Sequence, residues 1–212
     1  MNIPEMKLED SAASSMADIG LIPGGEDLNM FIWPGHDFRD LEVLDNLPNV
    51  RQVVATSPGY LEFNDHYSSD TLIRGSKTSH ELVEQFYEEY GEGVFDFEHG
   101  HAVMEDFSES EVLETEEKIE KIRRLGETSN KALKDDGRAV YNLNSMSHGV
   151  VNEVKDDSFS VADYQQGHGA LFKEVLEDEY FENVRWTDEI TGDNYHSDTV
   201  FVIADNPLKN IK

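Results

Sequence analysis

The 212-residue sequence contains no cysteine. This absence excludes disulfide bonds and thiolate chemistry, and it leaves His, Asp and Glu as the side chains from which a metal site would have to be built. These side chains do not have the spacing of a helical zinc site, so we expect no bound metal. A chain without cysteine also fits a reducing compartment, and we expect a cytoplasmic protein.

The sequence also lacks any run of about 18 or more apolar residues, the length that a membrane-spanning helix requires. Its first residues, Met1 to Leu8, do not have the basic-then-apolar order of a secretory signal. We therefore expect no membrane association and a protein that stays in the compartment where it is made.

Basic residues are few: 17 Lys and Arg stand against 45 Asp and Glu, and the formal net charge is -28. Phosphate contacts need clustered Lys and Arg, so direct binding to nucleic acid is not expected. The acids are scattered along the whole chain, which fits three interpretations. They are a halophilic surface whose repulsion is screened by molar salt, an ordinary solvated surface, or a nucleic-acid mimic, as a virus could encode, that binds a basic protein partner.

Apolar runs typical of strands alternate with helical spacing from Leu28 onward. The expected strands are 28–33, 50–55, 71–74, 94–97, 138–143, 184–186 and 199–204. The expected helices are 38–47, 78–90, a long one from 108 to the turn signal Asp136-Gly137, and 169–176. This alternation predicts a doubly wound, mostly parallel α/β sheet of the Rossmann-like kind, with the last two strands forming an antiparallel pair. Residues 1–27 show no sustained apolar period and are expected to form an arm or a loose helix before a single domain at 28–212.

Three segments of the second half resemble class I, Rossmann-type, S-adenosylmethionine-dependent methyltransferases. Residues 131–140 (KALKDDGRAV) resemble the helix, turn and fifth strand of that family. Residues 94–107 (VFDFEHGHAVMEDF) are similar to its fourth strand and the following loop, and residues 181–204 to its last two antiparallel strands. The resemblance implies a methyltransferase-type sheet and S-adenosylmethionine as cofactor.

The first half departs from the family pattern. The loop after the first strand, which in the family is rich in glycine and approaches the cofactor, has here only Gly35. The second strand ends without the acid that binds the ribose hydroxyls, and the third lacks the acid that contacts the adenine side. The positions that match the family's cofactor-binding elements, and that we expect to bind the cofactor, are Pro34, Gly35, His36, Asp37, Thr56, Ser57 and Glu98.

Histidine and glutamate follow the fourth predicted strand, at the edge where open α/β sheets bind ligands. We expect His99 or His101 to act as a general base, because imidazole titrates near neutral pH, and Glu105 to assist. The alternative for each is an exposed loop residue, and Asp37 also suits a helix cap. The predicted function is methyl transfer from S-adenosylmethionine to an unidentified small molecule or other non-basic acceptor. The alternative is a non-catalytic binding protein that uses its acidic surface against a basic partner.

Overall fold

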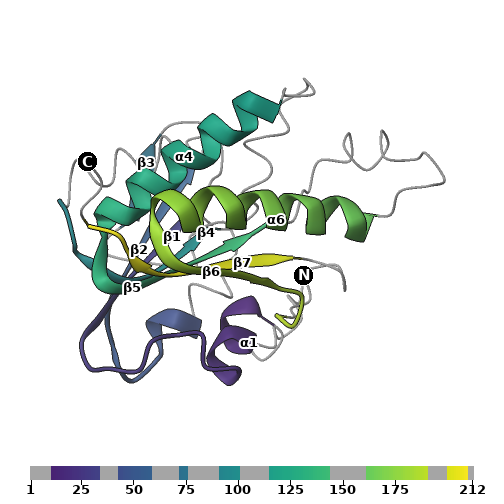
Figure 1. Ribbon diagram of the computed structural model, residues 1–212. Coiled ribbons are helices and arrows are strands. Elements are labelled where there is room, and N and C mark those ends of the chain that lie inside the picture. The colour runs from purple at the N-terminus through teal and green to yellow at the C-terminus, as the bar shows by residue number, and fades with distance from the viewer. Residues whose placement is uncertain are drawn as a thin grey trace.

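The structure is a computed structural model, and it describes residues 11–33, 43–58, 72–75, 91–100, 115–143, 161–190 and 200–209. Within these ranges the chain forms one sheet with helices on both faces (Figure 1). None of the described helices is long and apolar enough to cross a membrane.

Seven strands among the described residues make up the sheet, in the order β3-β2-β1-β4-β5-β7-β6. The first five pair in parallel, whereas β7 is antiparallel to both β5 and β6. This arrangement confirms the predicted doubly wound sheet with an antiparallel C-terminal pair. The strands are β1 (Leu28–Trp33), β2 (Val50–Pro58), β3 (Leu72–Gly75), β4 (Phe95–Gly100), β5 (Leu133–Asn142), β6 (Phe181–Thr187) and β7 (Phe201–Pro207).

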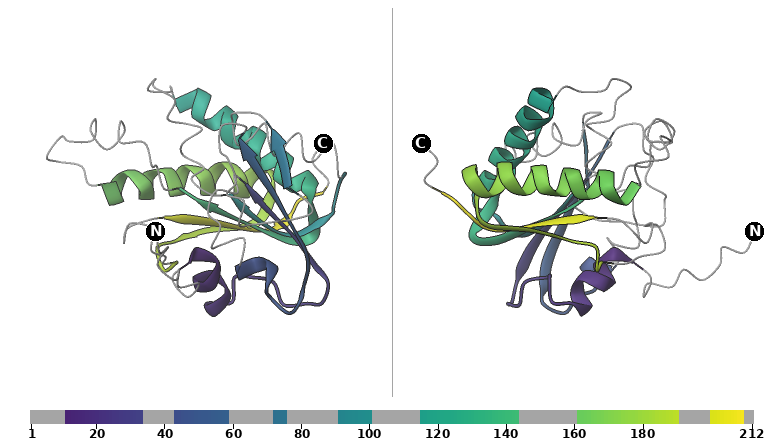
Figure 2. Two further views of the ribbon diagram at one scale, coloured as in Figure 1. Left: turned by 180° about the vertical axis from the view of Figure 1, so that it is seen from behind. Right: turned by 45° about the vertical axis from the view of Figure 1, so that its right-hand side comes forward.

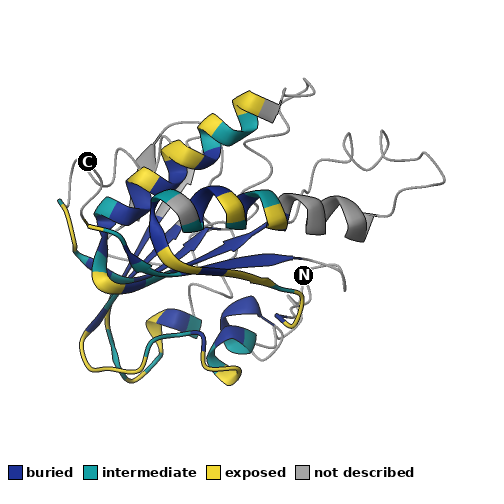
Figure 3. Cartoon of the chain, in the orientation of Figure 1, coloured by how far each residue is buried: buried dark blue, intermediate teal, exposed yellow. Residues whose placement is uncertain are grey.

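Two long helices, α4 (Thr115–Ala132) and α6 (Val161–Glu179), lie side by side on one face of the sheet, and α1 (Ala12–Asp18) lies on the other (Figures 1 and 2). Acids in the first turn of α4 and Lys131 in its last turn match the helix dipole. The helices approach closely at Gly126, where an added Cβ would lie 2.7 Å from Cδ2 of Leu176 on α6. Figure 3 shows exposed residues on the outer side of α4 and buried ones toward the sheet.

The strands alternate their side chains between two hydrophobic clusters, one on each face. On the α4/α6 face the largest buried side chains include Phe31, Phe95, Tyr141 and Phe172. The opposite cluster contains buried aliphatic side chains of β1 and β2 with Phe97 and Phe201. Both faces of the sheet are therefore buried, as a parallel sheet requires.

The segment before the first strand forms the helix α1, whose N-cap Ser11 accepts a hydrogen bond from the backbone N–H of Ser14 at 3.1 Å. Ala12, Ala13 and Met16 are fully buried and belong to the same cluster as β1. This helix is thus part of the hydrophobic core.

Two of the predicted helix boundaries were wrong. The long helix ends at Ala132, not at residue 133 or beyond, and β5 begins at once with Leu133. Residues 134–137 then form a bulge in β5. Leu133 pairs with Phe95 and Arg138 with Phe97, so four residues of β5 lie opposite one residue of β4. The turn predicted at Asp136-Gly137 lies inside this bulge, and Gly137 is required there because a Cβ would lie 2.9 Å from the Lys134 carbonyl oxygen.

The second difference concerns α6, which starts at Val161 and not near residue 169. The sequence placed the start of this helix at Gly169, whereas Gly167 and Gly169 both lie well within it. Gly169 is buried, and a Cβ there would lie 3.1 Å from Val200 and 3.4 Å from Trp186. Close packing of α6 on the sheet explains this glycine, a cause that local propensity does not reveal.

Candidate functional site

The carboxyl ends of the parallel strands form the edge at which the sequence places the site. Trp33 at the end of β1 is level with Gly100 at the end of β4, and Gly100 is level with Tyr141 of β5. The sheet order changes direction between β1 and β4, since β2 and β3 lie on one side and β5 on the other. Such a switch point is where open α/β sheets bind ligands.

Six of the predicted site residues lie outside the described residues. They follow directly in sequence from the ends of β1 and β4: Pro34, Gly35, His36, Asp37, His101 and Glu105. Thr56 and Ser57 lie near the end of β2, which extends three residues beyond its predicted end and pairs them with Ile73 and Arg74 of β3.

His99 lies within β4 and is fully buried on the α1 face of the sheet. Its Nδ1 is 3.1 Å from the carbonyl oxygen of Val140 on β5. A carbonyl only accepts hydrogen bonds, so Nδ1 carries the proton, and in the neutral ring Nε2 holds the lone pair. The structure thus orients His99 with Nε2 as its basic nitrogen.

Glu98 is also fully buried, but its side chain lies on the opposite face, beneath α4. Its Oε1 accepts a hydrogen bond of 2.8 Å from the hydroxyl of Ser129 on that helix. Burial, and next the Glu98 carboxylate, raise the pKa of the nearby Tyr141 phenol well above its ordinary value, so the phenol stays protonated at neutral pH. Glu98, Ser129 and Tyr141 form a buried polar cluster that joins β4, α4 and β5.

Adjacent residues of β4 therefore serve opposite faces of the sheet. The sequence suggested a loop after residue 97, because Glu and His are uncommon in strand interiors, whereas β4 continues to Gly100. The strand alternates sides at each residue, which separates the carboxyl group of Glu98 from the imidazole of His99.

Sequence reasoning missed two fully buried polar residues: Ser129 on α4, which bonds Glu98, and Asn142 at the end of β5. Helical spacing carried a signal for Ser129, because it stands seven residues after Ile122 and four after Leu125, on the buried stripe of α4. Asn142 ends β5 as a buried amide after an apolar run, so it lies toward the carboxyl edge of the sheet.

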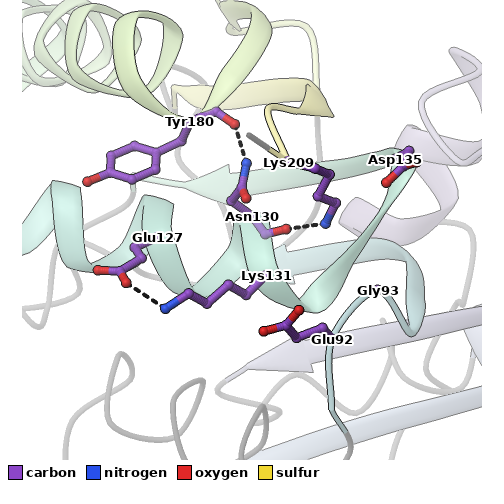
Figure 4. Close-up of a pocket in the computed structure, with 8 residues that line it drawn as sticks. All are labelled: Glu92, Gly93, Glu127, Asn130, Lys131, Asp135, Tyr180 and Lys209. Carbon is purple, nitrogen blue, oxygen red and sulfur yellow. Dashed lines mark hydrogen bonds and ion pairs between the residues drawn. The ribbon is translucent and has the colours of Figure 1, made fainter. Parts of the chain in front are cut away.

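A cavity of about 670 Å³ lies at the opposite, amino edge of the sheet (Figure 4). Charged side chains that line this cavity bond within the protein. Lys131 pairs with Glu127 at 2.5 Å. Lys209 donates to the carbonyls of Asn130, near the end of α4, and of Leu133, the first residue of β5. Burial lowers the pKa of Lys209. These bonds tie the end of α4 to the chain after β7, a structural role.

No protein-family model matches the sequence, and no curated protein does. Several solved structures are similar. A chain from the complex of the Haloferax volcanii Trm112 methyltransferase activator with a proposed methyltransferase matches with a TM-score of 0.57 and 11% identity, over 95% of this chain and 96% of that one. Spermidine synthase from Thermotoga maritima matches with a TM-score of 0.53 and 12% identity, over 96% of this chain and 61% of that enzyme.

At these identities the similarity concerns the fold. This chain spans less than two thirds of the length of the spermidine synthase, but nearly all of the Haloferax chain. Together with the strand order and the antiparallel β7, the matches show that the chain has the Rossmann-like fold of class I methyltransferases.

Proposed function

We propose that the protein transfers a methyl group from S-adenosylmethionine to a small-molecule or other non-basic acceptor. The observation that carries this proposal is the switch point between β1 and β4, where the strand ends Trp33 and Gly100 are level. The predicted cofactor loop 34–37 and the predicted catalytic residues His101 and Glu105 follow these two ends in sequence.

The chemistry of the described residues fits an adenosyl cofactor at this edge. Asn142, with its amide donor and acceptor, is buried at the end of β5, and β2 contributes the hydroxyl residues Thr56 and Ser57 near its end. S-adenosylmethionine supplies an electrophilic methyl group when bound. The protein's own task is to align the acceptor with that group and to remove a proton where the acceptor requires it.

His99 is suited to the proton-removing role, because the Val140 carbonyl fixes its tautomer and leaves Nε2 as the base. His101, two residues further on, is the second candidate for this role. In addition to the predicted cofactor contact, Glu98 supports the site by joining β4 to α4, because its Oε1 accepts a hydrogen bond from Ser129.

Calorimetric titration with S-adenosylmethionine and with its demethylated product tests the proposal. We expect binding by the parent protein and weaker binding by Gly35→Val, whose branched side chain would obstruct a close backbone approach. His99→Gln and His101→Ala should keep cofactor affinity, and the variant of the true base should lower turnover by roughly 100-fold or more against a panel of small acceptors. Equal affinity in Gly35→Val would show that residues 34–37 are not the cofactor loop.

A non-catalytic binding protein is the second candidate. The neutral end of β2, where Thr56 and Ser57 stand in place of an acid, favours it, as does the net charge of -28. This candidate predicts no heat of cofactor binding and a salt-sensitive complex with a basic protein.

A further inference from the structure

Strand β6 is the last in the sheet order, and none of the described strands pairs with its outer side. An open strand edge exposes backbone groups that can bind another strand. Trp186 of β6 lies beside Gly169 of α6 and is 38% exposed. The outer edge of β6 is therefore a site where strand addition would be expected.

The backbone of Val184, in the middle of β6, is bonded to α6 instead. Its N–H donates to Oε1 of Glu177 at 3.4 Å, and its carbonyl accepts from Nζ of Lys173 at 2.9 Å. A backbone N–H has one proton to donate, and that of Val184 goes to Glu177 and not to β7. This N–H therefore points to the outer side of β6. The flanking residues Asn183 and Arg185 are paired with Asp205 and Ile203 of β7.

Lys173 and Glu177 also form an ion pair of 3.4 Å, one helical turn apart. The two side chains thus cover both polar groups of Val184 and hold each other in place. We call this arrangement the Lys173–Glu177 latch. Its side chains are 44% and 39% exposed, so a competing strand could displace them at modest cost.

We propose that the Lys173–Glu177 latch withholds the outer edge of β6 from strand addition by a second copy of this chain. A two-fold, antiparallel pairing centred on Val184 would place Asn183 opposite Arg185 and Glu182 opposite Trp186. No like charges would face each other, and a symmetric pairing of this kind closes on itself as a dimer.

The double variant Lys173→Ala/Glu177→Ala tests the latch, because it removes one positive and one negative charge and leaves the net charge of the chain unchanged. The matched control is Glu127→Ala/Lys131→Ala, which removes the i,i+4 ion pair of α4 and likewise leaves the net charge unchanged. Sedimentation velocity over a series of protein concentrations, at low and at molar KCl, measures the association of each.

The latch variant should gain a species of twice the parent mass, with self-association at least about 10-fold tighter than in the parent and strongest at high salt, where repulsion is screened. The control should behave as the parent. A labelled peptide with the sequence of residues 181–187 should likewise bind the latch variant and not the control. If the double variant loses its helical signal, Lys173→Met, which keeps the side-chain length, takes its place. Parent-like mass together with no peptide binding would overturn the proposal.

Discussion

The two faces of the sheet are built differently. One is covered by α4 and α6, of 18 and 19 residues, and encloses large aromatic side chains together with the polar cluster of Glu98, Ser129 and Tyr141. The other is covered, in the described part of the chain, by the seven-residue α1 and a helical turn at 43–45, and it buries His99. We call the face under α4 and α6 the thick face and the face under α1 the thinner face. The thick face contains the large aromatic core, and the thinner face contains the candidate base His99.

Truncating the largest buried side chain of α6 should have the largest effect. Phe172→Ala should lower the free energy of unfolding by about 3–5 kcal/mol, because it leaves a cavity beside Tyr141, whose ring centroid is 6.5 Å away. Met16→Ala, its counterpart on α1, should cost less, since α1 is short and its surroundings can close on the gap. Urea denaturation measures both, and a larger loss for Met16→Ala would reverse the ranking of the faces.

The attachment of the segment after α1 to the thinner face should depend on the hydrogen bonds of one side chain, Arg138. Arg138 of β5 pairs with Asp205 of β7 and donates from NH1 to the carbonyl of Leu21, just after α1, at 2.6 Å. Arg138→Met should cost about 2–3 kcal/mol, because charge-assisted bonds between partly buried groups are lost. Arg185→Met, which removes the more exposed partner of Asp205, is the control and should cost under about 1 kcal/mol. Equal losses in the two variants would show that Leu21 contributes nothing.

The polar cluster on the thick face can be tested by one hydroxyl. Ser129→Ala should cost about 1–2 kcal/mol, because a hydrogen bond to a buried carboxyl group is lost. Thr128→Ala is a suitable control, since the Thr128 hydroxyl bonds only the preceding helical turn, at the carbonyl of Arg124. Unfolding curves in which Ser129→Ala is no less stable than Thr128→Ala would contradict the cluster's contribution.

The smallest effect on stability should appear only above pH 10. Burial raises the pKa of Tyr141 well above 10, and burial followed by Glu179 raises that of Tyr180 to about 12. Both groups favour the folded state below pH 10, and this stability is lost as the pH rises through the folded-state pKa values. Tyr141→Phe should therefore flatten the decline in stability above pH 10, measured by urea midpoints at several pH values. A decline as steep as in the parent would exclude Tyr141 as its source.

Local sequence patterns predicted the strands well, because buried parallel strands are short apolar runs between turn residues, as at Leu28–Trp33 and Val50–Pro58. They failed where packing decides. The predicted helix began at Gly169, whereas α6 begins at Val161, and the contacts of Gly169 with Val200 and Trp186 are not visible in the sequence. Glu98 was predicted to follow the fourth strand, whereas it lies within β4 beneath Ser129.

The candidate site was predicted less completely than the fold. Its edge follows from topology, but alternation along β4 sends Glu98 and His99 to opposite faces, which a sequence cluster of acids and histidines cannot indicate before the strand's end is known. The bond from His99 to the Val140 carbonyl joins residues 41 apart in sequence, and no local signal predicts it.

The position of β7 has a consequence for synthesis on the ribosome. This strand follows the other described strands in sequence but lies inside the sheet, between β5 and β6. While Phe201–Pro207 of a nascent chain are still inside the ribosome, β6 lacks its only described strand partner. The side of β5 that pairs with β7 is open for the same time. Folding of this half must then wait until residues 201–207 have left the ribosome, and until that moment the unpaired strands are available to chaperones or to misassembly.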